Sequence, residues 1–125
     1  GYRVQGKSNL EADKILEDAL AVQDAGAFSV VLEGVPAELA EKITVELSIP
    51  TIGIGAGPGC DGQIQVFHDI LGLYGDFIPK HAKRFTNLGE QIKNSISRYK
   101  RAVESKEFPA EEHTVYSTHS SLKNN

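Results

Sequence analysis

The amino-acid sequence predicts an α/β fold with a parallel sheet, and three observations support this prediction. Short apolar runs rich in β-branched residues lie at 28–32 and 49–54. Amphipathic helical patterns precede, separate and follow these runs. The elements follow the order helix, strand, helix, strand, strand, helix, which is typical of parallel βαβ units. A parallel sheet is normally covered on both faces, and a sheet of only three strands is therefore a poor isolated structure. We therefore expect the chain to be part of a larger α/β domain that lacks its first elements.

The first predicted helix begins after Ser8. Ser8 and Glu11 form the S-x-x-E pattern of a capping box, and Gly26 is placed to end the helix. Its apolar stripe consists of Ala12, Ile15, Leu16, Ala19, Leu20 and Val22. The run from Phe28 to Leu32 then predicts a strand that is buried on both faces.

The remaining elements follow in order. Pro36 suits the first turn of a second helix, whose apolar face is formed by Leu39, Ala40, Ile43 and Leu47. Residues 49–54 predict a second buried strand, and residues 63–67 a third. A second capping box at Asn87 and Glu90 predicts a last helix, with an apolar face formed by Leu88, Ile92, Ile96, Tyr99 and Val103. We expect residues 1–109 to belong to the domain, and residues 110–125 to form a polar tail that is mobile or lies over a neighbour.

Composition excludes several classes of protein. Hydrophobic residues make up 40% of the chain and charged residues 24%, which are ordinary globular values. The net charge of −4 without a basic stripe argues against nucleic-acid binding. The single cysteine, Cys60, excludes an intrachain disulfide, and no apolar run is long enough to span a membrane. We expect a cytoplasmic protein, or a mitochondrial-matrix protein in a eukaryote. Since the chain has no methionine and starts at Gly1, we expect a processed chain or a fragment.

Glu33 is the first candidate functional residue. It follows the aliphatic residues Val30, Val31 and Leu32 at the end of a predicted strand. A carboxylate there is costly to bury unless it is paired or functional, and a buried carboxylate suits a general base. The alternative is a strand-end glutamate that faces solvent or caps the next helix.

A glycine-rich segment from Gly53 to Gly62 is the second candidate. Glycines after a strand allow the backbone to approach a ligand or other backbone closely, so a ligand-facing wall and a plain tight turn are both open interpretations. Its G-x-G-x-x-G pattern at 57–62 contains Pro58 and no clear helix follows directly, which argues against a dinucleotide site.

Other motifs carry weaker indications. Residues 1–8 match the P-loop pattern G-x-x-x-x-G-K-S, but no strand precedes them and the middle residues are bulky. His68 and Asp69 are adjacent on a predicted strand end, where their side chains would point to opposite faces, so structural hydrogen bonds are expected for each. Cys60 is expected to be a free, packed thiol. His81, His113 and His119 show no metal-site spacing, and the last two are expected to be solvated.

Several segments together resemble the ketopantoate hydroxymethyltransferase family, in the family's order and spacing. They are 1–6 (GYRVQG), 31–36 (VLEGVP), 49–57 (IPTIGIGAG), 61–63 (DGQ), 67–69 (FHD) with Gly72, 79–83 (PKHAK) and the ending at 99–113. The resemblance covers residues 1–113. It implies a (β/α)8 TIM barrel related to phosphoenolpyruvate mutase and isocitrate lyase, of which this chain would be the C-terminal half, starting after about the fifth strand.

The resemblance also implies an activity. Family members transfer a hydroxymethyl group from 5,10-methylenetetrahydrofolate to 3-methyl-2-oxobutanoate, giving 2-dehydropantoate in pantothenate biosynthesis. In the family Mg²⁺ binds the keto acid through its carboxylate and keto oxygens and acidifies the C3 proton, which a glutamate removes. The family's glutamate lies in the segment that matches 31–36, so Glu33 inherits the role of base. The magnesium ligands, and the lysine and serine that hold the keto acid, belong to the N-terminal half of the barrel.

Two other functions remain open from the sequence. One is a non-catalytic half-barrel that acts in assembly, for which Glu33→Ala would change nothing measurable. The other is a P-loop nucleotide binder that uses Gly1 to Ser8. For the transferase we expect the N-terminal half of the same barrel as partner, inactivity of the lone chain, and a homo-oligomer, with the helix from Asn87 onward and the tail as candidate contacts.

Overall fold

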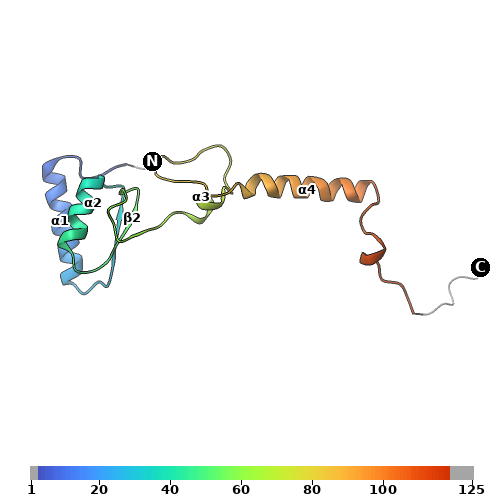
Figure 1. Cartoon of the computed structure of the whole chain (residues 1–125), viewed down its shortest axis with the longest axis horizontal. Helices are drawn as coiled ribbons and strands as arrows, with labels where there is room; N and C mark the ends of the chain where they lie inside the picture. The colour runs from blue at the N-terminus through green and yellow to red at the C-terminus, as the bar shows by residue number, and fades with distance from the viewer. Residues whose placement is uncertain (1–2, 119–125) are drawn as a thin grey trace, which may run out of the picture.

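The computed structural model describes residues 3–118 as an α/β body followed by a projecting helix (Figure 1). The body contains two helices and a short sheet. The elements in chain order are α1 (Asn9–Asp24), β1 (Val30–Glu33), α2 (Ala37–Glu46), β2 (Thr51–Ile54), β3 (Gly62–Gln63), α3 (Phe67–Leu71), α4 (Leu88–Glu104) and a 3-10 turn, η1 (Glu111–His113).

The sheet has the order β1-β2-β3, and both pairings are parallel. In the first pairing Val30 lies opposite Thr51 and Glu33 opposite Ile54. The predicted α/β fold with a parallel sheet is therefore confirmed. Because parallel strands all end at the same edge, the residues that follow β1 and β2 lie next to each other.

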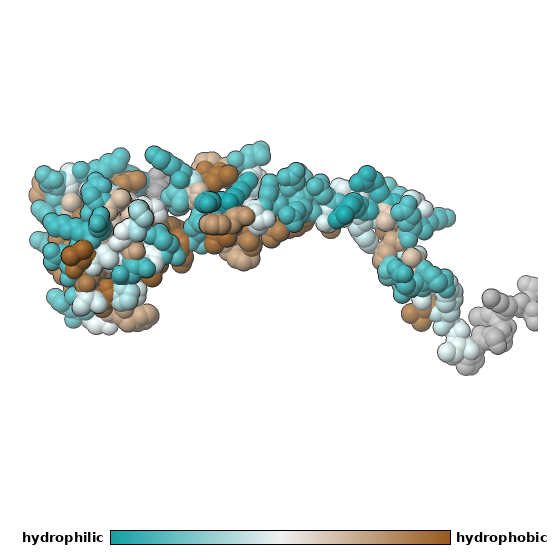
Figure 2. Space-filling model, viewed as in Figure 1, coloured by the Kyte–Doolittle hydropathy of each residue, from teal (hydrophilic) through white to brown (hydrophobic). Residues whose placement is uncertain are grey.

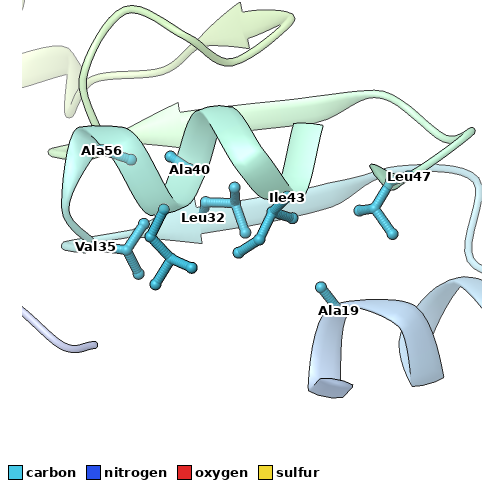
Figure 3. Close-up of a cluster of buried hydrophobic side chains, with 8 residues drawn as sticks. Ala19, Leu32, Val35, Ala40, Ile43, Leu47 and Ala56 are labelled. Atoms are coloured by element: carbon cyan, nitrogen blue, oxygen red, sulfur yellow. The ribbon is translucent and has the colours of Figure 1, made fainter. Parts of the chain in front are cut away.

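The hydrophobic core lies between one face of the sheet and α2 (Figure 3). Leu32 points from β1 toward Ala40 and Ile43 of α2, and both of these helix residues are fully buried. Ala19 of α1 belongs to the same core and lies near Leu47. The apolar stripes predicted for α1 and α2 form this core, except that Val22 is 42% exposed.

The opposite face of the sheet is uncovered among the described residues. Val31 on β1 is 57% exposed, and Ile64, just after β3, is 51% exposed. The prediction that the first strand is buried on both faces is therefore wrong for this chain, because α2 covers only the face of Leu32. Phe28 lies before the strand and is almost fully exposed.

The starts of α1 and α4 agree with the predictions, but only one of the two predicted capping boxes forms. At α1 the capping box forms as predicted, with the Glu11 amide donating to Ser8 Oγ at 3.2 Å and the Ser8 amide to Glu11 Oε2 at 3.5 Å. At α4 the second predicted capping box is wrong, since Asn87 Nδ2 donates to Glu90 Oε2 at 3.1 Å and its side chain caps no backbone amide. Pro36 precedes α2 as its N-cap rather than occupying the first turn.

The third strand is much shorter than the predicted range of 63–67. Pairing ends soon after Gln63, with one further bond from the Ile64 amide to the Gly53 carbonyl at 3.0 Å. The carbonyl of Val66 accepts bonds from the amides of Asp69 and Ile70, which starts α3 instead. Phe67 is therefore helical, and the prediction for these residues is wrong.

The long helix α4 projects away from the body and none of its residues is buried (Figure 1). Its predicted apolar face is present but exposed, and Figure 2 shows hydrophobic residues along one side of the helix. Exposed fractions range from 45% to 62% at Ile92, Ile96, Tyr99 and Val103. Phe108 beyond the helix packs edge-on against the ring of Tyr99, with centroids 5.8 Å apart.

The predicted tail begins with η1, where Tyr116 Oη donates to Glu111 Oε2 at 2.9 Å. The end of the tail, residues 119–125, lies outside the described residues, so its predicted mobility stays a prediction. Over the described residues, no helix is both long and apolar enough to cross a membrane.

Candidate functional site

Glu33 is the last residue of β1 and its side chain is exposed. It lies on the uncovered face of the sheet together with Val31, because Leu32 between them points into the core. The expected burial of Glu33 is therefore not found in this chain, for the same reason that Val31 is exposed. Within residues 3–118 no ion pair or hydrogen bond involves its carboxylate, which leaves both oxygens available.

The backbone that follows Glu33 is held on both sides. Gly34 has φ 62°, a left-handed conformation that a residue with a Cβ adopts only with strain. Its amide donates to the Ile54 carbonyl at 2.9 Å, and its carbonyl accepts from the Gln5 amide at 2.7 Å. The chain segment before α1 and the end of β2 thus clamp the strand end that carries Glu33, so its Cα is fixed although its side chain is free.

The glycine-rich segment after β2 packs against α2. A Cβ at Gly57, where φ is 78°, would lie 2.5 Å from the Cβ of Ala37, and one at Gly59 would lie 3.0 Å from that of Glu41. Glycine is therefore required here for close approach to the helix. Packing against α2 accounts for these two glycines, and the choice between a tight turn and a ligand-facing wall stays open.

A polar network that the sequence analysis missed ties this glycine-rich segment to the sheet. Thr51 is fully buried, and its backbone amide and hydroxyl donate to Asp61 Oδ2 at 2.9 and 3.3 Å. The Asp61 amide donates back to Thr51 Oγ1 at 3.2 Å, and Thr44 of α2 shares a 2.8 Å hydroxyl contact with Thr51. Asp61 lies ten residues after Thr51 in the sequence, and this spacing by itself does not predict that the two residues bond to each other.

A hollow of about 790 Å³ opens beyond the carboxyl end of β2. Gly55 and Gly57 form part of its wall, and the segment after α3 forms another part. Its lining includes Val4, Pro58, Phe77, Pro79, Lys80 and His81. Glu33 is not part of the lining. The backbone of Glu33 lies beside the hollow. The amide of the following residue, Gly34, bonds to the Ile54 carbonyl, and Gly55, which follows Ile54, is part of the wall.

His68, Asp69 and Cys60 are other candidate residues, and they do not line the hollow. His68 and Asp69 lie on α3, not on a strand, and the His68 ring stacks on Tyr74 with centroids 4.9 Å apart. Cys60 is a free, half-buried thiol that packs against the core, as predicted.

The structure describes only one of the two histidines in the predicted tail, His113. The Ala110 amide donates to Nδ1 of His113 at 3.1 Å, and the His113 ring lies 5.1 Å from that of Phe108. His113 is nevertheless exposed, as predicted. His119 lies outside the described residues.

The P-loop interpretation finds no support in the geometry. Gly1 and Tyr2 lie outside the described residues. Of the rest, the Gln5 amide already donates to Gly34 and the Ser8 hydroxyl caps α1. The amides of Gln5 and Ser8 are thus used within the fold and are not available to a phosphate.

Within residues 3–118, no group of three or more His, Cys, Asp or Glu side chains could hold a metal ion. The only acidic group at the carboxyl ends of β1 and β2 is Glu33, and one carboxylate does not make a magnesium site. The described residues therefore do not fit Mg²⁺ by themselves.

Comparisons with known proteins agree on one family. A family model described as ketopantoate hydroxymethyltransferase matches residues 1–111. A 3-methyl-2-oxobutanoate hydroxymethyltransferase of Chloroflexus aggregans is 59% identical over 114 residues, which cover 91% of this chain and 41% of the relative. Proteins with the same name from Pelobacter propionicus and Clostridium beijerinckii are 60% and 49% identical, over 91% and 98% of this chain and 42% and 45% of their own lengths. The chain thus spans less than half of the length of these relatives.

Proposed function

Because this chain belongs to the ketopantoate hydroxymethyltransferase family, we propose that it forms the C-terminal half of an enzyme that transfers a hydroxymethyl group from 5,10-methylenetetrahydrofolate to 3-methyl-2-oxobutanoate. The product is 2-dehydropantoate. The observation that carries the proposal is the position of Glu33, an exposed carboxylate on a fixed backbone at the carboxyl end of a parallel strand. Active sites of α/β barrels lie at that end of the strands.

In this proposal Glu33 is the general base. Its carboxylate takes the proton from C3 of the keto acid, and the electron pair of the broken C–H bond passes into an enolate. The enolate carbon then forms a new carbon–carbon bond to the methylene carbon of the folate, and one of the two C–N bonds of that carbon breaks. Water displaces the second nitrogen and supplies the hydroxyl oxygen. The proton held by Glu33 and one proton of the water go to the two freed nitrogens, so that tetrahydrofolate leaves. Both oxygens of Glu33 are free of other partners among the described residues, so the carboxylate can accept a proton without first breaking a bond.

The uncovered face of the sheet supports a complete (β/α)8 barrel as the working form. Val31 and Glu33 would face the inside of such a barrel, and β1 and β3 would each gain a neighbouring strand. We propose that the N-terminal half provides these strands together with the keto-acid and magnesium ligands. Since the described residues do not fit a magnesium site, the role proposed for this chain contains no metal-dependent step. A cytoplasmic location is part of the same proposal.

A homo-oligomer is the further expectation for the complete protein. The apolar side of α4 carries Ile92, Ile96, Tyr99 and Val103, all at least 45% exposed. A contiguous apolar stripe of this kind on an otherwise charged helix is typical of a contact surface. The same stripe favours the second candidate function, a half-barrel whose role is assembly and which takes no part in catalysis.

The two candidates differ in a transfer assay on a chimera. In the chimera this chain replaces the matching 114-residue segment of the Chloroflexus aggregans relative. With magnesium, keto acid and methylenetetrahydrofolate present, the proposal predicts 2-dehydropantoate formation by the chimera at a rate comparable with that of the relative, and none by the lone chain. A folded, oligomeric chimera that forms no product would favour the assembly function and refute the transferase proposal.

A further inference from the structure

The hollow beyond β2 combines an apolar surface with a single exposed cation. Its apolar walls come from Val4, Pro58, Phe77 and Pro79, and Phe77 is 79% exposed. A large aromatic ring that is this exposed gains little from its own chain, whereas it offers a flat face to a planar ligand. The volume of about 790 Å³ lies within the range of sites that hold small organic molecules.

Lys80 supplies the charge of this hollow. It is exposed, and within residues 3–118 its ammonium group makes no ion pair. The nearby Lys83 is placed differently, since its Nζ lies over the ring of Phe85, 5.0 Å from the centroid. Lys80 is therefore the cation available to an anionic group of a ligand that lies against Phe77.

A backbone hydrogen bond also holds the wall of the hollow next to the strand end that carries Glu33. The Gly34 amide is bonded to the Ile54 carbonyl at 2.9 Å, and the residue after Ile54 is part of the wall. A ligand in the hollow thus approaches the strand end that carries the base without displacing it. Gln63 helps to keep the wall in place, because its Nε2 donates to the Gly57 carbonyl at 2.9 Å.

From these three features we propose that the hollow binds the p-aminobenzoyl-glutamate part of the folate co-substrate. The benzoyl ring lies against Phe77 and the two prolines, and Lys80 binds a glutamate carboxylate. The reactive pterin end then extends toward Glu33. This inference rests on the proposed transferase function and adds to it the residues that select the one-carbon donor.

The test measures steady-state kinetics of the chimera with Lys80→Ala, and with Lys83→Ala as the matched control. Loss of one charge-assisted hydrogen bond predicts that Lys80→Ala raises KM for methylenetetrahydrofolate about tenfold or more. KM for the keto acid should stay unchanged, and so should the folate-independent exchange of its C3 proton with solvent. Lys83→Ala should leave all three quantities unchanged.

A second probe tests the chemistry of the contact. p-Aminobenzoyl-glutamate should inhibit the chimera competitively against methylenetetrahydrofolate, and its uncharged bis-amide should inhibit at least about tenfold more weakly. In Lys80→Ala the two compounds should inhibit equally. Unchanged folate KM in Lys80→Ala, or equal inhibition by both compounds of the unsubstituted chimera, would overturn this inference while an active chimera still upheld the transferase. A chimera with neither proton exchange nor transfer would instead remove the proposed function itself.

Discussion

Replacing Thr51 by valine should loosen the glycine-rich segment from the sheet. The substitution keeps the shape of a fully buried side chain but removes its hydroxyl. That hydroxyl contacts Thr44 Oγ1 at 2.8 Å, donates to Asp61 Oδ2 at 3.3 Å and accepts from the Asp61 amide at 3.2 Å. In the variant the Asp61 amide loses its acceptor, while Asp61 Oδ2 keeps the bond from the Thr51 amide.

The expected cost follows from these contacts. Each hydrogen bond contributes about 0.5–1.5 kcal/mol net, and because Asp61 is exposed, its amide bonds to water in the variant instead of being buried without a partner. The Thr44 hydroxyl keeps its 2.7 Å bond to the Ala40 carbonyl, so it adds little. We expect the free energy of unfolding to fall by about 1–2 kcal/mol.

Urea unfolding and amide hydrogen exchange of the chimera measure this effect. The exchange rate of the Asp61 amide should rise most, followed by that of Ile64, whose amide bonds to Gly53 next to the network. Thr114→Val is the control, because its exposed hydroxyl makes only a 2.8 Å bond to the Ala110 carbonyl. A Thr51→Val variant that loses no more stability than Thr114→Val would refute the structural role given to the network.

Two further substitutions test the packing of the body. Ile43→Ala should lower the free energy of unfolding of the chimera by about 2–5 kcal/mol, because Ile43 is fully buried. The control Val45→Ala, on the exposed side of α2, should lower it by less than about 0.5 kcal/mol. Equal urea midpoints of the two variants would contradict the described core. Gly57→Ala should destabilise the chimera by more than about 1 kcal/mol and raise KM for methylenetetrahydrofolate, because the new methyl group would meet Ala37 and φ is 78°. Gly75→Ala, where a Cβ would contact nothing within 4 Å, is the control, and similar thermal midpoints and KM values for both glycine variants would contradict the close approach.

The sequence correctly predicted features that depend on residues close to one another along the chain. The Ser8 and Glu11 capping box forms because both partners lie within one turn. The parallel pairing of β1 and β2 followed from the helix between them. The third strand was predicted too long, because the apolar pattern of residues 63–67 does not show that the Val66 carbonyl turns back to accept helical amides.

Non-local features of the candidate site could not be predicted in this way. The position of Glu33 at a strand end was predicted, but its exposure depends on which elements cover that face of the sheet. The hollow joins Val4 to Phe77 and Lys80, and the polar network joins Thr51 to Asp61. No spacing in the sequence indicates these contacts, since they depend on how the segments after β2 and α3 return to the sheet.

The most direct test of the central claim is the rate at which the C3 proton of 3-methyl-2-oxobutanoate exchanges with deuterium from solvent in the chimera. This rate isolates the step given to Glu33, because it needs no folate. The account predicts that Glu33→Gln lowers the exchange rate by about 100-fold or more, the range expected for loss of a general base. Glu46→Gln, an exposed position at the end of α2, should leave it unchanged. An unaltered exchange rate in Glu33→Gln would contradict the assignment of Glu33 as the base.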